Sequence, residues 1–302
     1  MTAIRPASLE DVPAASRLLS AVEEDRVLTA EGMLHFVRTV PERARRVLWT
    51  AEEDGELVAW ATAGLTWESD EAGDCFGSLV VHPAHRRRGV GTALWERLDE
   101  HLGDIGARRV NVLGRDEPDA HRFATARGFH ETSRVRMSRL DLTTLPPPPE
   151  PPDDVELRPF TAFADDPRPV YELDLEVSPD IPLDQPVGHV PWDEWLERYW
   201  RHPMVDHECS LVLLVDGVPA SFTLLVAAHD SGRAMTGMTG TRRAFRGRGL
   251  AELVKRHSLA RAAEAGLTAA FTENEESNAA MLAVNERLGY RPSSTRVSFL
   301  RP

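Results

Sequence analysis

One short motif occurs twice in this chain, at Arg86–Gly91 and again at Arg246–Ala251. Both copies fit the pattern Arg/Gln-x-x-Gly-x-Gly/Ala, and each lies between a predicted strand and a predicted helix. The first turn of a helix has unpaired backbone N–H groups and the positive end of the helix dipole, so it is suited to binding phosphate. Glycines let the backbone approach such a ligand closely. The chain is therefore predicted to hold a pyrophosphate at two places.

Two other short sequences recur in the same order as the motif. Ile4–Pro6 returns as Leu157–Pro159, and Arg127–Phe129 returns loosely as Leu288–Tyr290. The offsets of the three repeated sequences are 153, 160 and 161 residues, a drift that a few inserted loop residues explain. Because these three repeated sequences follow one another in the same order in both halves, they predict a duplicated domain.

A proline-rich run, residues 146–154 (PPPPEPPDD), separates the two halves. Proline lacks a backbone N–H and fixes φ, so this run is excluded from helices and central strands. At about 3.1 Å per residue it would form a stiff spacer of roughly 28 Å. We expect one domain over 1–145 and a second over 155–302, each large enough to bury its own core.

Composition restricts the class of protein. The chain has 302 residues, of which 42% are hydrophobic, as in a globular protein. No membrane span, secretory signal or metal site is expected, and the two cysteines, Cys75 and Cys209, predict no disulfide framework, which makes the cytoplasm the default location. The net charge of −13 disfavours nucleic acid as a partner. It favours a cationic substrate through steering, although solubility alone also explains it.

The apolar pattern predicts a similar series of strands and helices in both halves. In the first half we expect strands at 2–6, 46–51, 57–62, 75–81, 109–112 and 134–140, and helices from residue 9, at 89–102 and at 120–126. In the second half we expect strands at 210–216, 220–227, 235–241, 269–272 and 297–300, and helices at 250–265 and 278–288. The turns Asp54–Gly55 and Asp216–Gly217 predict a hairpin in each half.

These features resemble the GNAT family of N-acetyltransferases. The first half carries the resemblance through Val80–Gly91 and the closing Arg127–Phe129, and the second half through Thr241–Ala251 and Asn274–Gly289. The resemblance covers nearly all of the chain outside the proline-rich run. It implies an α/β fold of two GNAT domains, each a mixed, mostly antiparallel twisted sheet flanked by helices. It also implies acetyl-CoA, or another acyl-CoA, as the donor of an acyl group.

The resemblance implies where acetyl-CoA binds in each half. In this family the pyrophosphate lies on the motif loop, and the pantetheine arm pairs with the end of the preceding strand. The residues implied in the first half are Leu79, Val80, Val81, Arg86, Arg87, Arg88, Gly89, Val90, Gly91 and Thr92. Those implied in the second half are Thr239, Gly240, Thr241, Arg246, Gly247, Arg248, Gly249, Leu250, Ala251, Glu252, Asn274 and Asn278.

Some of these residues also have ordinary structural explanations. Arg86–Arg88 would suit a solvated basic loop, although cations at a helix N-terminus oppose the dipole, which favours an anionic ligand. Asn274 and Asn278 would suit a cap for the helix that follows them, and Asn278 would serve equally well as a cap or a cofactor contact.

The expected chemistry is direct attack of an amine on a thioester. The amine must lose a proton, and the thioester oxygen gains charge that a backbone N–H can stabilise. Many family members protonate the departing thiolate with a tyrosine four residues before the closing glycine. Here that position holds Ala124 and Asn285. Either another group serves, or the thiolate, whose pKa is about 8.5, leaves without assistance.

Carboxylates in the second half are the candidates for the general base. Glu273 and Glu275 lie at the end of the strand expected to border the acetyl group, and Asp180 lies in the region that covers the substrate site in the family. Glu23–Asp25 occupy a similar position in the first half. For each carboxylate, simple surface solvation is the alternative.

An aromatic stripe distinguishes the second half from the first. Trp192, Trp195, Tyr199 and Trp200 recur at helical spacing, which suits either a helix packed on the core or a wall for a cationic amine. With the glutamates, this asymmetry favours the second half as the catalytic domain. We expect an N-acetyltransferase acting on a primary amine of a small molecule, in a monomeric pseudo-dimer or a homodimer. The alternative is a non-catalytic acyl-CoA-binding or sensing protein.

Overall fold

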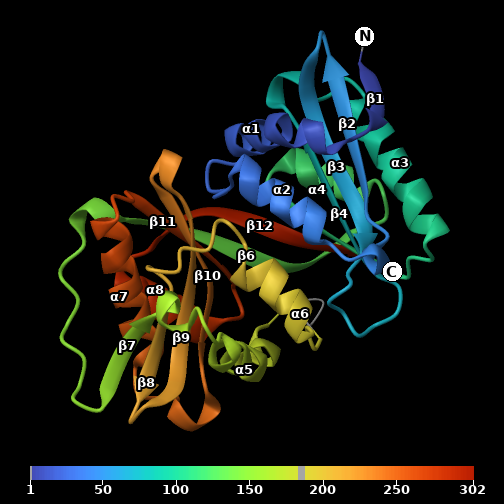
Figure 1. Cartoon of the computed structure of the whole chain (residues 1–302). Coiled ribbons are helices and arrows are strands. Elements are labelled where there is room, and N and C mark those ends of the chain that lie inside the picture. The colour runs from blue at the N-terminus through green and yellow to red at the C-terminus, as the bar shows by residue number, and fades with distance from the viewer. Residues whose placement is uncertain (1, 183–187) are drawn as a thin grey trace. The chain divides into compact units, whose positions relative to one another are not determined.

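The computed structural model describes residues 2–182 and 188–302 and separates into two compact units (Figure 1). Unit 1 contains the chain up to Arg134 together with Thr295–Pro302, and unit 2 contains Val135–Ser294. Both units combine a mixed, mostly antiparallel sheet with helices, so the predicted fold class is confirmed. Within the described residues, no helix is both long enough and apolar enough to cross a membrane.

Unit 1 is a sheet with strand order β1-β2-β3-β4-β5-β12, in which β4 and β5 are parallel and the other pairs are antiparallel. Its strands are β1 (Ala3–Pro6), β2 (Val47–Glu53), β3 (Glu56–Leu65), β4 (Asp74–Val81), β5 (Arg109–Arg115) and the end of β12 (Arg291–Arg301). Its helices are α1 (Val12–Val22), α2 (Ala30–Thr39), α3 (Val90–Asp104) and α4 (Pro118–Thr125).

Helices cover both faces of the sheet in unit 1, and side chains that alternate along its strands contact the helices on each face. On β3, Trp60 packs with α1 and α2, whereas Ala59 and Ala61 pack beneath α3. Side chains of a strand point alternately to opposite faces, so a strand of small and apolar residues buries both. The α3 and α4 face is the one that matters for the site described below.

Unit 2 repeats this architecture with strand order β7-β8-β9-β10-β11-β6. Its strands are β7 (Val155–Pro159), β8 (Leu211–Val215), β9 (Val218–Ala228), β10 (Arg233–Thr241), β11 (Ala269–Glu275) and the later part of β6 (His130–Asp141). Its helices are α5 (Arg168–Val177), α6 (Trp192–Trp195), which continues as a wider turn over Leu196–Trp200, α7 (Leu250–Glu264) and α8 (Ala279–Leu288). In Figure 1, α7 and α8 lie on one side of the sheet and α5 on the other, as the core clusters also show.

The two compact units differ from the two halves of the sequence in their last strands. Residues 135–141 of β6, which end the first half, pair with β11 of unit 2. Residues 296–301 of β12, which end the second half, pair with β5 of unit 1. Each half therefore contributes its last strand to the other unit. The boundaries at 145 and 155 remain a prediction about the duplicated sequence, and residues 146–154 contain neither helix nor strand.

Candidate functional site

A cleft forms in unit 1 where β4 and β5 part. The two strands pair only over Asp74–Gly77 and Arg109–Val112, and β4 then continues to Val81 while pairing only with β3. The edge of β4 beyond Gly77 thus presents backbone N–H and C=O groups without a partner from β5. Backbone groups of this kind need a hydrogen-bonding partner, which an extended ligand can supply.

The loop after β4 holds the start of α3 open to an anion. Gly89 precedes the helix with φ of 86°, and Arg87 also has a positive φ, of 62°. Arg86 Nε donates a 3.1 Å hydrogen bond to the carbonyl oxygen of Val81, which fixes the loop on the strand. In the part of the chain that the structure describes, no side chain caps the helix at Gly89, so the first-turn N–H groups remain available to a phosphate.

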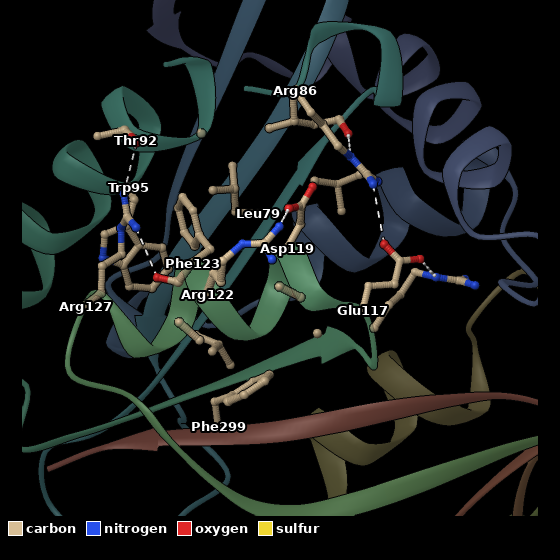
Figure 2. Close-up of a pocket in the computed structure, with 18 of the residues that line it drawn as sticks. Leu79, Arg86, Thr92, Trp95, Glu117, Asp119, Arg122, Phe123, Arg127 and Phe299 are labelled. Carbon is tan, nitrogen blue, oxygen red and sulfur yellow. Dashed lines mark hydrogen bonds and ion pairs between the residues drawn. The ribbon is translucent and has the colours of Figure 1, made fainter. Parts of the chain in front are cut away.

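A cavity of about 580 Å³ joins the free edge of β4 to this loop. Figure 2 shows it between Leu79, Arg86 and Thr92 on one side and α4 on the other. The predicted residues that line it are Leu79, Val80, Val81, Arg86, Arg87, Gly89, Gly91 and Thr92. A Cβ atom at Gly91 would lie 3.5–3.7 Å from Phe123, Val81 and Leu79, so these three side chains converge on the glycine.

Ion pairs surround the mouth of this cavity. Arg86 lies 3.5 Å from Glu117, Arg87 lies 3.7 Å from Asp119, and Arg88 lies 3.7 Å from Glu53. The Arg87 side chain is 73% exposed, so its pair is weak and open to exchange. An incoming phosphate would compete with carboxylates at this loop rather than meet bare arginines.

Unit 2 reproduces the same backbone arrangement. β10 and β11 pair only over Arg233–Thr236 and Ala269–Thr272, and β10 then continues to Thr241. Gly247 and Gly249 have φ of 77° and 75°, and Arg246 Nε donates a 3.0 Å hydrogen bond to the carbonyl oxygen of Thr241. The duplicated motif therefore builds the same loop twice, with Leu250–Glu252 as the first turn of α7 and Arg248 paired to Asp154.

Asp180 forms ion pairs with two arginines of the loop between β10 and α7, Arg243 and Arg246. Its carboxylate accepts hydrogen bonds from Arg243, at 2.7 Å and 3.2 Å, and from Arg246. The Arg243 guanidinium, followed by that of Arg246, lowers the pKa of Asp180 to about 2. A carboxylate with so low a pKa is a weak base, so this position suits control of the loop better than proton abstraction.

The predicted residues of β11 point to two different faces of the sheet. Glu273 and Glu275 alternate with Asn274, and Asn274 Oδ1 accepts a 2.7 Å hydrogen bond from Asn285 Nδ2 on α8. Asn278 caps α8, since its Oδ1 accepts a hydrogen bond from the backbone N–H of Met281. The cap proposed for Asn278 is present, whereas its contact with a cofactor remains a prediction.

The aromatic stripe is part of the core of unit 2. Trp195 and Trp200 are buried, and Trp200 stacks on Phe160 with a ring-centroid distance of 5.2 Å.

The sequence analysis did not identify Asp174, a polar residue that contacts this aromatic cluster. Asp174 of α5 accepts hydrogen bonds from Trp195 Nε1 at 2.7 Å and Ser178 Oγ at 2.9 Å. Burial raises the pKa of Asp174, which makes it a better base than Asp180.

Cys75 and Cys209 are both free thiols and both buried. Burial raises the pKa of Cys75 to about 11 and that of Cys209 to about 12. Neither thiol has the lowered pKa of a nucleophilic cysteine.

Comparison with known proteins gives one consistent family. The Acetyltransferase (GNAT) family model matches residues 15–129 and 162–290. A mycothiol acetyltransferase of Geodermatophilus obscurus is 29% identical, over 98% of this chain and 95% of its own length, and one of Parafrankia sp. is 27% identical, over 99% and 97%.

Solved structures share the fold over the whole chain. A tandem GNAT protein from the clavulanic acid biosynthesis pathway has a TM-score of 0.75 at 22% identity and covers 99% of this chain and 98% of its own. A GCN5-related N-acetyltransferase from Sphaerobacter thermophilus also has a TM-score of 0.75, at 23% identity, with coverage of 100% and 96%. From the two matched regions and the two motif loops, we conclude that this chain belongs to the GNAT family of N-acetyltransferases.

Proposed function

We propose that this protein transfers the acetyl group of acetyl-CoA to a primary amine of a small molecule, by direct attack of the amine on the thioester. The observation that carries the proposal is the free edge of a strand leading into an uncapped helix N-terminus, which occurs in both units. A pantetheine arm has amide groups for the strand, and a pyrophosphate has charge for the helix. Relatives along the full length carry the name mycothiol acetyltransferase, which supports a small-molecule acceptor.

The residues present fit acetyl-CoA in both units. In unit 1 the apolar Leu79, Val81 and Phe123 would face the arm, and the loop from Arg86 to Thr92 would hold the phosphates. In unit 2 the matching groups are Thr239–Thr241 and Arg246–Glu252. The buried Oδ1 of Asn285 has no hydrogen-bonding partner among the described residues, and an amide N–H of the arm would satisfy it.

We place the transfer step in unit 2. Glu273 and Glu275 on β11 and the half-buried Asp174 on α5 are the carboxylates proposed to accept the proton of the amine, directly or through water. A backbone N–H of the free edge of β10 would stabilise the thioester oxygen. In unit 1, Glu23 borders the cavity, but Arg26 holds it at 2.5 Å and Arg296 lies 3.6 Å away. Unit 1 is therefore proposed to bind acyl-CoA without turnover.

Release of CoA thiol during incubation with acetyl-CoA and a panel of small primary amines tests this function. We expect at least one amine to release thiol well above the rate without amine. Gly249→Glu, which places a carboxylate in the phosphate loop of unit 2, should abolish the release, whereas Gly89→Glu in unit 1 should retain it. Both glycines have open space around them, so the change acts through charge and the positive φ rather than through a clash.

A second candidate function is acyl-CoA binding without chemistry. It is favoured by Ala124 and Asn285, which provide no tyrosine hydroxyl at the position of the family's usual acid. Tight acetyl-CoA binding with no thiol release for any amine would select this candidate over the acetyltransferase.

A further inference from the structure

Lys255 is the single lysine of a chain that contains 34 arginines. It lies in α7 and is only 2% exposed. Arginine stays protonated at any physiological pH, whereas a buried lysine gains and loses its proton readily. The one lysine of the chain therefore occupies a buried position, where its ability to lose a proton distinguishes it most from arginine.

Among the described residues, none provides a counter-ion for the ammonium group of Lys255. Its Nζ lies 5.5 Å from the ring centroid of Tyr290 and, within the part of the chain that the structure describes, forms no hydrogen bond or ion pair. Burial lowers the pKa of Lys255 to about 7. Desolvation alone produces this change, since no charged neighbour contributes to it.

The elements packed against α7 bring few charges near this group. β8 and β9 carry no titratable residue, and β10 has Arg233 at its far end. Glu252, one turn earlier on α7, is held by Arg256 at 2.9 Å and by Arg287 of α8 at 2.6 Å, and Glu286 of α8 pairs with Arg136 at 3.6 Å. The phenol of Tyr290, whose ring centroid lies 5.5 Å from Lys255 Nζ, is also titratable, but burial raises its pKa, so it stays neutral.

Contacts of Tyr290 place Lys255 at the point where β10 and β11 part. The Tyr290 hydroxyl lies 3.3 Å from Thr236 Oγ1, and Thr236 with Thr272 is the last parallel pair of these strands. The backbone N–H of Tyr290 donates to the carbonyl oxygen of Asn285, the residue at the position of the family's usual acid. An arm running along Thr241–Thr239 would bring its thioester end toward this point.

In unit 1, the corresponding place where β4 and β5 part is lined by apolar residues. At the offsets of the duplicated motifs, Trp95 corresponds to Lys255 and Phe129 to Tyr290. Gly77 closes the last parallel pair of β4 as Thr236 does that of β10. The Trp95 ring packs against Phe129 at 5.5 Å and close to Gly77. Unit 2 has thus replaced an apolar cluster with an amine and two hydroxyls at equivalent positions.

We propose that Lys255 is the acid that protonates the departing CoA thiolate in unit 2, in place of the tyrosine that Asn285 replaces. The amine nitrogen of the acceptor bonds to the carbonyl carbon, the C–S bond breaks, and the sulfur takes a proton from the Lys255 ammonium. The acceptor nitrogen loses its proton to a carboxylate or water, and Lys255 regains one from solvent. This inference rests on the proposed function of unit 2.

Because the chain has one lysine, its ionisation can be read directly by NMR on protein labelled with ¹³C-lysine. The titration is run in the Gly89→Glu background, which closes unit 1, without ligand, with CoA, and with desulfo-CoA, in which hydrogen replaces the thiol. We expect CoA to raise the pKa of Lys255 by about one unit or more, because a thiolate nearby favours the ammonium. We expect desulfo-CoA to bind without that effect.

The same pKa with both bound ligands would overturn the inference and leave the proposed function standing. Failure of either ligand to bind in this background, with binding in wild type, would reject unit 2 as the acyl-CoA site and with it both proposals.

Activity gives a second readout. Wild type is expected to lose kcat above pH 7, where Lys255 loses its proton. Lys255→Met should lower kcat about 100-fold, leave KM for acetyl-CoA little changed, and remove this dependence on pH. The control is Ser258→Ala, which alters another buried residue on the same helix and leaves the lysine in place. A Lys255→Met enzyme with wild-type kcat and pH profile would contradict the inference.

Discussion

Asn285 donates a 2.7 Å hydrogen bond from its side-chain amide to the side-chain oxygen of Asn274, joining α8 to the end of β11. The bond leaves the Oδ1 atom of Asn285 buried and without a partner in this structure. A buried acceptor without a partner is costly, and a ligand N–H would relieve that cost. We therefore propose that this pair couples the structure of unit 2 to binding of the acyl-CoA arm.

Asn285→Leu should weaken acetyl-CoA binding in unit 2 about fivefold, because a hydrogen bond worth about 1 kcal/mol is lost. Calorimetry in the Gly89→Glu background measures this site alone. Urea unfolding is the control. Removing the buried unpaired acceptor stabilises the free protein, losing the hydrogen bond to Asn274 destabilises it, and the net change in the free energy of unfolding should stay within about 1 kcal/mol. Unchanged affinity would show that Asn285 does not contact the arm.

Asp180→Asn should leave kcat within about twofold and lower KM for acetyl-CoA severalfold, because it frees Arg243 and Arg246 for phosphate. Asp154→Asn, which frees Arg248 from the same kind of pair, is the matched control and should act on KM in the same direction. A hundredfold loss of kcat in Asp180→Asn alone would instead make Asp180 the general base.

Lys255 should make stability depend on pH. Its pKa is 10.5 in the unfolded chain and about 7 in the folded one, so between these values the unfolded state binds more protons. The free energy of unfolding contributed by this residue therefore rises from pH 7 toward pH 10, and below pH 7 the full penalty of a buried charge remains. Urea unfolding of wild type and Lys255→Met should show the variant favoured at pH 6, by roughly 2 kcal/mol more than at pH 9. A difference that does not vary with pH would mean that Lys255 titrates normally.

Gly240→Ala should destabilise the protein by about 1–3 kcal/mol, because a Cβ there would lie 2.3 Å from a methyl group of Val177. The contact fixes α5 on the strand that is proposed to hold the arm. Gly103→Ala is the control, since Gly103 lies within α3 with open space around it, and this change should stabilise by up to about 1 kcal/mol. Equal effects of the two substitutions in urea unfolding would refute the tight contact.

The sequence predicted the parts of this fold that depend on local pattern. The two loops at Arg86–Gly91 and Arg246–Ala251 and the strands and helices beside them follow from glycine spacing and apolar periodicity. The exchange of β6 and β12 could not be predicted, because strand pairing is non-local and both candidate partners have the same pattern. The ion pairs of Asp180 likewise depend on tertiary packing across 63 and 66 residues of sequence.

The sequence alone could single out one of two further residues proposed for the site, but not the other. No sequence pattern distinguishes Asp174, because its raised pKa depends on its contact with Trp195 in the folded protein. Lys255 did have one: a count of amino acids shows that it is the single lysine of the chain, within the helix that follows the second motif.

The most direct test of the account is the stoichiometry of acetyl-CoA binding by calorimetry on wild type, Gly89→Glu and Gly249→Glu. Two similar loops on two similar strand edges predict two molecules bound per chain in wild type and one in either variant. A stoichiometry of one in wild type that a single variant abolishes, or no binding at all, would contradict the proposal that the duplicated motif builds two acyl-CoA sites.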